Sequence, residues 1–191
     1  MDSLQRHDPS LSAPAVGLSL AGSGLVTAML AGGTGLSSFF DPVSLTVVAG
    51  SVTGLLLAAF GLRGTGRAFA TLLWGGGTPD LAHSTAFFLS AAALSLLCGC
   101  AGSLIGLVQL LQQIGDPSAL GAAAAVAMLS SLYGLMGAAG AVGGAVSVAK
   151  REPSGTAVEA AAGTSLALVG AGGIALFAVP GLTFLLVMTA L

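Results

Sequence analysis

Five long apolar runs without a single Asp, Glu, Lys or Arg constrain this chain more than any other feature of its sequence. About 20 apolar residues suffice for a helix to cross the hydrocarbon core of a bilayer. Backbone groups in lipid must satisfy their own hydrogen bonds, which favours helices. The sequence therefore predicts an all-α integral membrane protein. The uncharged runs cover residues 9–40, 42–62, 81–115, 117–149 and 160–191.

The composition agrees with a membrane-embedded chain. Only 6% of the residues are charged and 55% are hydrophobic, whereas soluble domains carry about 25% charged residues. The formal net charge is −2 and no basic run is present, which argues against a nucleic-acid partner. We therefore expect the lipid bilayer to be the solvent of most of this chain.

Turn residues divide the runs into five predicted spans within a single transmembrane domain of residues 1–191. Asp41-Pro42 and Asp116-Pro117-Ser118 combine a helix stop with a capping side chain for the next helix. We expect two tight antiparallel hairpins, a C-terminal helix and a short cytoplasmic loop at residues 63–85. The expected spans are residues 16–39, 44–62, 86–114, 121–148 and 158–188.

Basic residues indicate the orientation, because cytoplasmic loops of membrane proteins are rich in Lys and Arg. With five spans, all five basic residues fall on the same side of the membrane. They are Arg6, Arg63, Arg67, Lys150 and Arg151. The pattern predicts a cytoplasmic N-terminus and a C-terminus on the opposite side.

No catalytic arrangement can be assembled from this sequence. No span carries an ionisable residue in its middle, although transporters that bind protons usually place one there. The glycine runs lie inside apolar spans without the Lys-Ser/Thr that completes a phosphate-binding loop. We expect a protein that is not an enzyme, with no cofactor and no metal.

Hydroxyl groups are the remaining polar groups within the spans. Ser103 lies thirteen residues before Asp116, and Ser130 lies fourteen residues after it. At about 1.5 Å per residue, Ser103, Ser130 and Ser131 lie at matching depth on neighbouring helices. They either bond to carbonyls of the preceding helical turn or line a polar seam for an ion or a partner's carboxylate.

Small residues on the same two helices predict close helix packing. Gly102 and Gly106 match the small-xxx-small pattern that lets helices approach in lipid, and Gly99 and Gly134 add further small surfaces. The pattern fits packing within one subunit and packing between subunits equally well.

Several stretches of the sequence resemble the flagellar stator proteins MotA and PomA, of the MotA/TolQ/ExbB proton channel family. Residues 39–51, which read FFDPVSLTVVAGS, are similar to that family's first hairpin and the start of its second helix. Residues 102–112 (GSLIGLVQLLQ), 116–121 (DPSALG) and 125–134 (AVAMLSSLYG) are similar to its third helix, the following turn and its fourth helix.

The resemblance implies a homo-pentamer in the bacterial inner membrane, with a periplasmic C-terminus. The pentamer would surround a MotB-like single-span partner that supplies an ion-carrying Asp. Ser103 matches a family Thr of the third helix, and Ser130 and Ser131 match the paired Thr beside the ion path. Tyr133 and the small residues Gly99, Gly102, Gly106 and Gly134 would pack against partners along the inner wall.

The chain also differs from that family. A large cytoplasmic region that faces the rotor is reduced here to residues 63–85, and the span at 158–188 is additional. We expect a MotA-like subunit of an ion-driven motor or channel complex, which couples H⁺ or Na⁺ flow to mechanical work on a rotor or another membrane protein. The alternative is a non-conducting membrane ring or scaffold protein derived from the same family.

Overall fold

The computed structural model describes residues 36–74, 81–151 and 156–190, together with Ser23, Thr27, Leu30 and Ala31. The chain divides into two compact units, Met1–Phe39 and Phe40–Leu191. A short 3₁₀ helix, η1 (Leu36–Phe39), belongs to the first unit. The expected span at 16–39 lies largely outside the described residues, so the fold below is that of the second unit.

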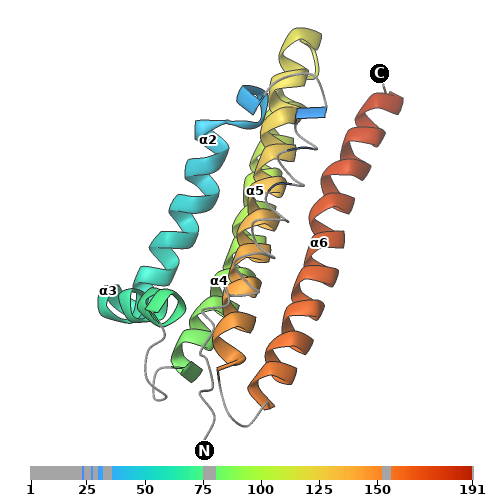
Figure 1. The fold of residues 1–191 in the computed structure, drawn as a ribbon. Helices are drawn as coiled ribbons and strands as arrows, with labels where there is room; N and C mark the ends of the chain where they lie inside the picture. Colours follow the sequence, from blue (N-terminus) through green and yellow to red (C-terminus); the bar gives the residue numbers. More distant parts are fainter. Residues whose placement is uncertain are drawn as a thin grey trace, which may run out of the picture. The chain divides into compact units, whose positions relative to one another are not determined.

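Every regular element of the described second unit is helical. Helices α4, α5 and α6 run side by side, with α3 next to α4 (Figure 1). Three segments are long and apolar enough to cross a membrane: Pro42–Trp74, Leu81–Gln112 and Ser118–Ala149. An all-α fold with membrane-spanning character is thus confirmed for the described residues. The elements are α2 (Pro42–Leu45), the π-helical turn η2 (Thr46–Gly50), α3 (Ser51–Trp74), α4 (Leu81–Gln112), α5 (Pro117–Ala149) and α6 (Thr156–Ala190).

Helix α3 is kinked at Gly61, which has a φ of 68° and a ψ of 168°. This backbone conformation is essentially confined to glycine, because a Cβ would clash with the neighbouring carbonyl. The part after the kink, residues 62–74, lies across the direction of the preceding helix (Figure 1); we name it the arm. The expectation of a loop over residues 63–85 differs from the structure, since the arm is helical to Trp74 and α4 begins at Leu81. Arginine is compatible with a helix, so Arg63 and Arg67 continue it and the kink occurs at Gly61 alone.

The arm is tied to the end of α5 by Arg151. Its guanidinium donates hydrogen bonds to the backbone carbonyl of Thr71 and, at 3.1 Å, to that of Leu72. These carbonyls belong to the last turns of the arm, where helix carbonyls lack intrahelical partners. Arg151 therefore serves as a C-terminal cap that is supplied by another helix.

Aromatic side chains pack the arm and the kink onto the first turns of α4. All of the ring contacts are edge-to-face, with ring centroids 5.2–5.8 Å apart. This is the arrangement that aromatic quadrupoles favour. The cluster comprises Phe60, Phe69, His83, Phe87 and Phe88.

Glycines bring α4 and α5 into close contact. A Cβ on Gly99 would lie 2.8 Å from the Cα of Gly134, and a Cβ on Gly134 would lie 2.7 Å from the carbonyl oxygen of Ser95. A Cβ on Gly106 would lie 2.5 Å from the backbone nitrogen of Ala127. The small residues of this pair of helices thus pack within one subunit.

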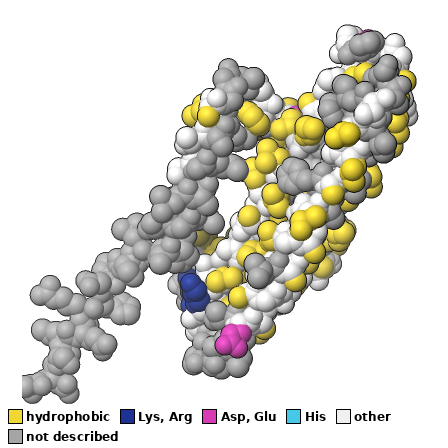
Figure 2. Space-filling view, turned by 90° about the vertical axis from the view of Figure 1, so that its right-hand side faces the viewer, with side chains coloured by type: hydrophobic (Ala, Val, Ile, Leu, Met, Phe, Trp, Pro, Cys, Tyr) yellow, Lys and Arg dark blue, Asp and Glu magenta, His cyan; other side chains and the backbone are white. Residues whose placement is uncertain are grey.

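Among the described residues, helices α4 and α5 carry no Asp, Glu, Lys or Arg side chain, whereas α3 carries Arg63 and Arg67 beyond its kink. Figure 2 shows hydrophobic side chains along one face, with the visible Lys, Arg, Asp and Glu side chains near its ends. Large apolar side chains remain exposed along α4, among them Leu97, Leu104 and Val108. Such a surface is typical of helices whose solvent is lipid.

Candidate functional site

The hairpin of α4 and α5 is longer than a bilayer core is thick. Helix α5 has 33 residues, which corresponds to about 50 Å, whereas the hydrocarbon core measures about 30 Å. The backbone N–H of Asp41 donates to the Tyr133 hydroxyl at 3.0 Å, and the Ser44 hydroxyl donates to the Val126 carbonyl at 3.4 Å. These contacts place Asp41 roughly 20 Å along α5 from Asp116. The two Asp-Pro turns, expected on one side of the membrane, therefore lie at different heights.

Asp41 is the N-cap of α2. Its carboxylate accepts hydrogen bonds from the backbone N–H of Ser44 at 2.9 Å, from that of Val43 at 3.3 Å, and from the Ser44 hydroxyl. The Ser44 hydroxyl and its backbone N–H stabilise the ionised form and hold the pKa of Asp41 below its ordinary value. Asp41 is thus an ionised carboxylate at one end of the Pro42–Trp74 segment.

Asp116 caps α5 in the same way. Its carboxylate accepts from the hydroxyl of Ser118 at 2.6 Å and from its backbone N–H at 3.0 Å, while Pro117 occupies the first helical turn. The Ser118 hydroxyl and backbone N–H lower the pKa of Asp116. The two turns therefore use one chemistry, in which an Asp and a Ser begin a helix.

Ser103 and Ser131 form a closed hydroxyl pair between α4 and α5. The Ser103 hydroxyl donates to the carbonyl of Ala127 at 2.7 Å and is itself hydrogen-bonded to the Ser131 hydroxyl, which lies 3.2 Å from the same carbonyl oxygen. The Ser131 hydroxyl also lies 3.3 Å from the Leu176 carbonyl of α6. Only 2% of Ser103 and none of Ser131 is exposed. The pair therefore joins three helices and has its hydrogen-bonding capacity filled from within the chain.

Ser130 differs from its neighbour. It is 1% exposed, and its hydroxyl has no hydrogen-bond partner. A serine in a helix ordinarily bonds to the carbonyl four residues earlier, which here is that of Val126; the Ser130 hydroxyl does not make this bond, and the Ser44 hydroxyl oxygen lies 3.4 Å from the same carbonyl oxygen. The Ser130 hydroxyl faces Gly102, since a Cβ on that glycine would lie 2.8 Å from it. Of the three predicted serines, Ser130 is the one with unused hydrogen-bonding capacity.

The π-helical turn η2 lies next to this hydroxyl. A Cβ on Gly102 would also lie 3.6 Å from a methyl group of Val47 in η2. Single π-turns within α-helices are rare and occur frequently at functional positions. No residue pattern in the sequence predicts the π-helical turn η2.

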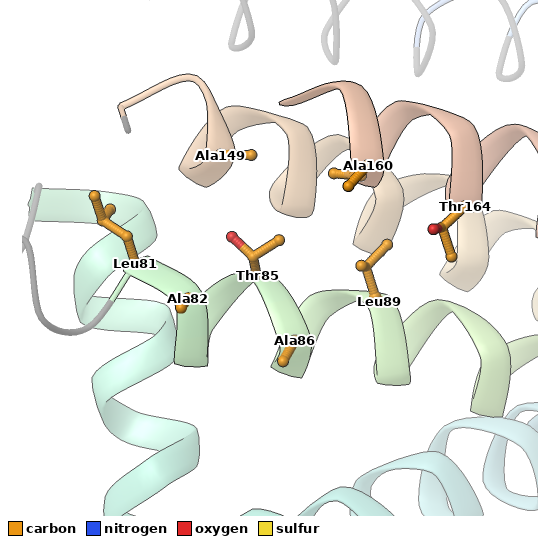
Figure 3. A pocket seen from close by; sticks show the side chains of 9 residues that line it. Leu81, Ala82, Thr85, Ala86, Leu89, Ala149, Ala160 and Thr164 are labelled. Carbon is orange, nitrogen blue, oxygen red and sulfur yellow. The ribbon is translucent and has the colours of Figure 1, made fainter. Parts of the chain in front are cut away.

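Two open apolar grooves flank the hairpin. One, of about 310 Å³, lies between η2–α3 and α4–α5 and includes Ser95, Tyr133 and Gly137. The other, of about 280 Å³, lies between α4, α5 and α6, where Thr85 and Thr164 supply the only hydroxyls (Figure 3). Neither groove is lined by an acidic, basic, His or Cys side chain. Among the described residues, no group of His, Cys, Asp and Glu side chains could hold a metal ion.

Comparison with known proteins identified no relative of this chain. No protein-family model matches the chain, and neither a curated protein nor a solved structure shows a significant match.

Proposed function

We propose that this chain is a MotA-like subunit of an ion-driven complex in the bacterial inner membrane. In this complex a single-span partner supplies the aspartate that carries H⁺ or Na⁺, and the subunit surrounds it as a homo-pentamer. Support comes from the sequence resemblance and from an α4–α5 hairpin that has buried hydroxyls but no carboxylate between Leu81 and Ile114 or between Ser118 and Ala149. The distribution of the basic residues supports a cytoplasmic N-terminus and a periplasmic C-terminus for this subunit.

The observation that carries the proposal is the unpartnered hydroxyl of Ser130. A buried hydroxyl without a hydrogen bond costs roughly 1–3 kcal/mol, and such groups in native proteins call for an explanation. A carboxylate or a desolvated cation from the ion path would be a partner for this hydroxyl. Gly102 lies beside the hydroxyl and beside Val47 of η2, so movement of the π-turn would open it.

Ion flux tests this proposal. Vesicles that contain the full chain and a single-span partner with an Asp should show a gradient-driven flux that Ser130→Ala reduces at least tenfold. Ser130→Thr should retain it, because the hydroxyl is kept. Ser147→Ala is the matched control on the same helix, since the Ser147 hydroxyl is bonded to the Gly143 carbonyl at 2.7 Å. Equal flux in Ser130→Ala and the wild type would remove the ion path.

The closed pair of Ser103 and Ser131 favours a second candidate, a non-conducting membrane ring or scaffold protein. Their hydroxyls are buried and bonded to carbonyls of α5 and α6, as expected for structural groups. A scaffold protein would give an oligomer by mass measurement but no flux with any single-span partner. Under that outcome the Ser130→Ala variant would assemble as the wild type does.

A further inference from the structure

We propose that the arm, residues 62–74, is a membrane-surface helix that binds anionic phospholipid headgroups. The inference is independent of ion conduction, because it concerns only the basic end of the described helices. It rests on the kink, on the side chains that the arm exposes and on the charges around it.

The position of the arm relative to the membrane follows from the length of the apolar helix before it and from the kink. The apolar stretch from Pro42 to Phe60 measures about 28 Å as a helix, which matches the thickness of the hydrocarbon core. Gly61 then turns the chain across that direction. Arg151 holds the far end of the arm through the carbonyls of Thr71 and Leu72. A helix that turns where the core ends lies in the headgroup region.

The arm carries an uncovered apolar stripe. Leu62 is 79% exposed and Leu73 66%, and Phe69, whose ring contacts Phe87 and Phe88 edge-to-face, is still 49% exposed. At about 100° per residue the side chains of Leu62, Phe69 and Leu73 lie within about 40° of one another around the helix axis. Ala68 and Thr71, on another face, are buried against the rest of the chain. One face of the arm therefore packs against the rest of the protein, and another exposes apolar side chains that suit an apolar medium.

A basic flank adjoins that stripe. Arg63, Arg67 and Trp74 fall within about 40° of one another on the next face, and Trp74 is 80% exposed. Tryptophan prefers the membrane interface, and arginines near the surface attract anionic lipids. This combination is typical of helices that lie in the interface plane.

The charge around the arm complements anionic lipid. No carboxylate is present anywhere in α3, and Lys150 and Arg151 lie at the same end as the arm. The described carboxylate at this end is Glu159, in the first turn of α6 rather than on the arm. An acidic protein partner would satisfy the arginines but would leave the apolar stripe in water, whereas a phospholipid satisfies both faces.

Trp74 provides the test, because it is the only tryptophan in the chain. The full chain is reconstituted in phosphatidylcholine vesicles that contain a fixed fraction of either brominated phosphatidylglycerol or brominated phosphatidylcholine. We expect several-fold stronger quenching of Trp74 fluorescence by the brominated anionic lipid. The double variant Arg63→Gln/Arg67→Gln should lose this preference, whereas Lys150→Gln, which removes a charge off the arm, should keep it.

Two results would overturn the proposal. Equal quenching by both brominated lipids in the wild-type protein would exclude selection for anionic headgroups. Quenching of Trp74 by aqueous iodide, with none by either brominated lipid, would place the arm in water or against a protein. Leu62→Ser/Leu73→Ser checks the apolar stripe separately, since it should increase iodide quenching while both arginines remain.

Discussion

Replacing Gly106 by Ala is the most direct perturbation of the α4–α5 contact. The new Cβ would lie 2.5 Å from the backbone nitrogen of Ala127, 2.7 Å from its Cα and 2.8 Å from its Cβ. Backbone cannot rotate away as a side chain can, so the helices must separate locally. Overpacking of this kind costs about 1–3 kcal/mol, and the gain in helix propensity from Gly to Ala returns about 1 kcal/mol.

The same movement strains the closed serine pair. Ala127 provides the carbonyl that accepts from Ser103, and Ser103 is bonded in turn to Ser131; interhelical hydrogen bonds in membranes contribute about 0.6 kcal/mol each. We therefore expect Gly106→Ala to lower the free energy of unfolding by about 2 kcal/mol.

Unfolding of the full chain by sodium dodecyl sulfate in mixed micelles, followed by circular dichroism, measures this change. Gly140→Ala is the matched control, because Gly140 is exposed and a Cβ there meets nothing within 4 Å. The control should be as stable as the wild type or more stable by up to about 1 kcal/mol. The reasoning fails if Gly106→Ala is no less stable than Gly140→Ala.

Three further predictions use the same unfolding assay. Gly102→Ala should be destabilising, because its Cβ would lie 2.7 Å from that of Ser130, and Ser130→Gly in the same chain should restore most of the loss; no restoration would contradict the contact. Gly61→Ala should cost about 1–3 kcal/mol through backbone strain alone, since a Cβ at Gly61 meets nothing within 4 Å; an unchanged stability would refute the kink. Asp41→Ala should cost about 1 kcal/mol as a lost N-cap. Because the folded pKa of Asp41 is lowered from 3.8, its contribution is complete above the unfolded pKa and is lost as the pH falls through the folded pKa, whereas Asp41→Asn should remove this pH dependence.

The sequence predicts the helices better than it predicts how they end. Uncharged runs and the Asp116-Pro117 cap locate α5, because burial in lipid and capping are local properties. The kink at Gly61 could not be foreseen, since many glycines in this chain lie within regular helix. Residues 63–85 were expected to be a short loop because they join two apolar spans, yet the arm is helical to Trp74, and its Arg63 and Arg67 are good helix formers.

The depth of the predicted serines followed from counting residues, but their hydrogen bonds did not. Ser130 and Ser131 are adjacent in sequence and differ by about 100° around α5, which turns one toward Gly102 and the other toward Ser103 and α6. The partners of Ser131 are Ser103, 28 positions before it, and Leu176, 45 positions after it, whereas the Ser130 hydroxyl has none. Contacts between residues so far apart in the sequence are visible only in three dimensions.

The two ends of the α4–α5 hairpin differ in whether they could transmit mechanical work from the proposed complex to a partner protein. At the basic end the arm lies against the membrane surface in our proposal, so it offers no raised surface for a rotor. At the opposite end the hairpin continues roughly 20 Å past Asp41, and its tip carries exposed Gln109, Gln112 and Asp116. If the proposed complex drives a partner, the orientation that the basic residues predict would present this tip on the periplasmic side.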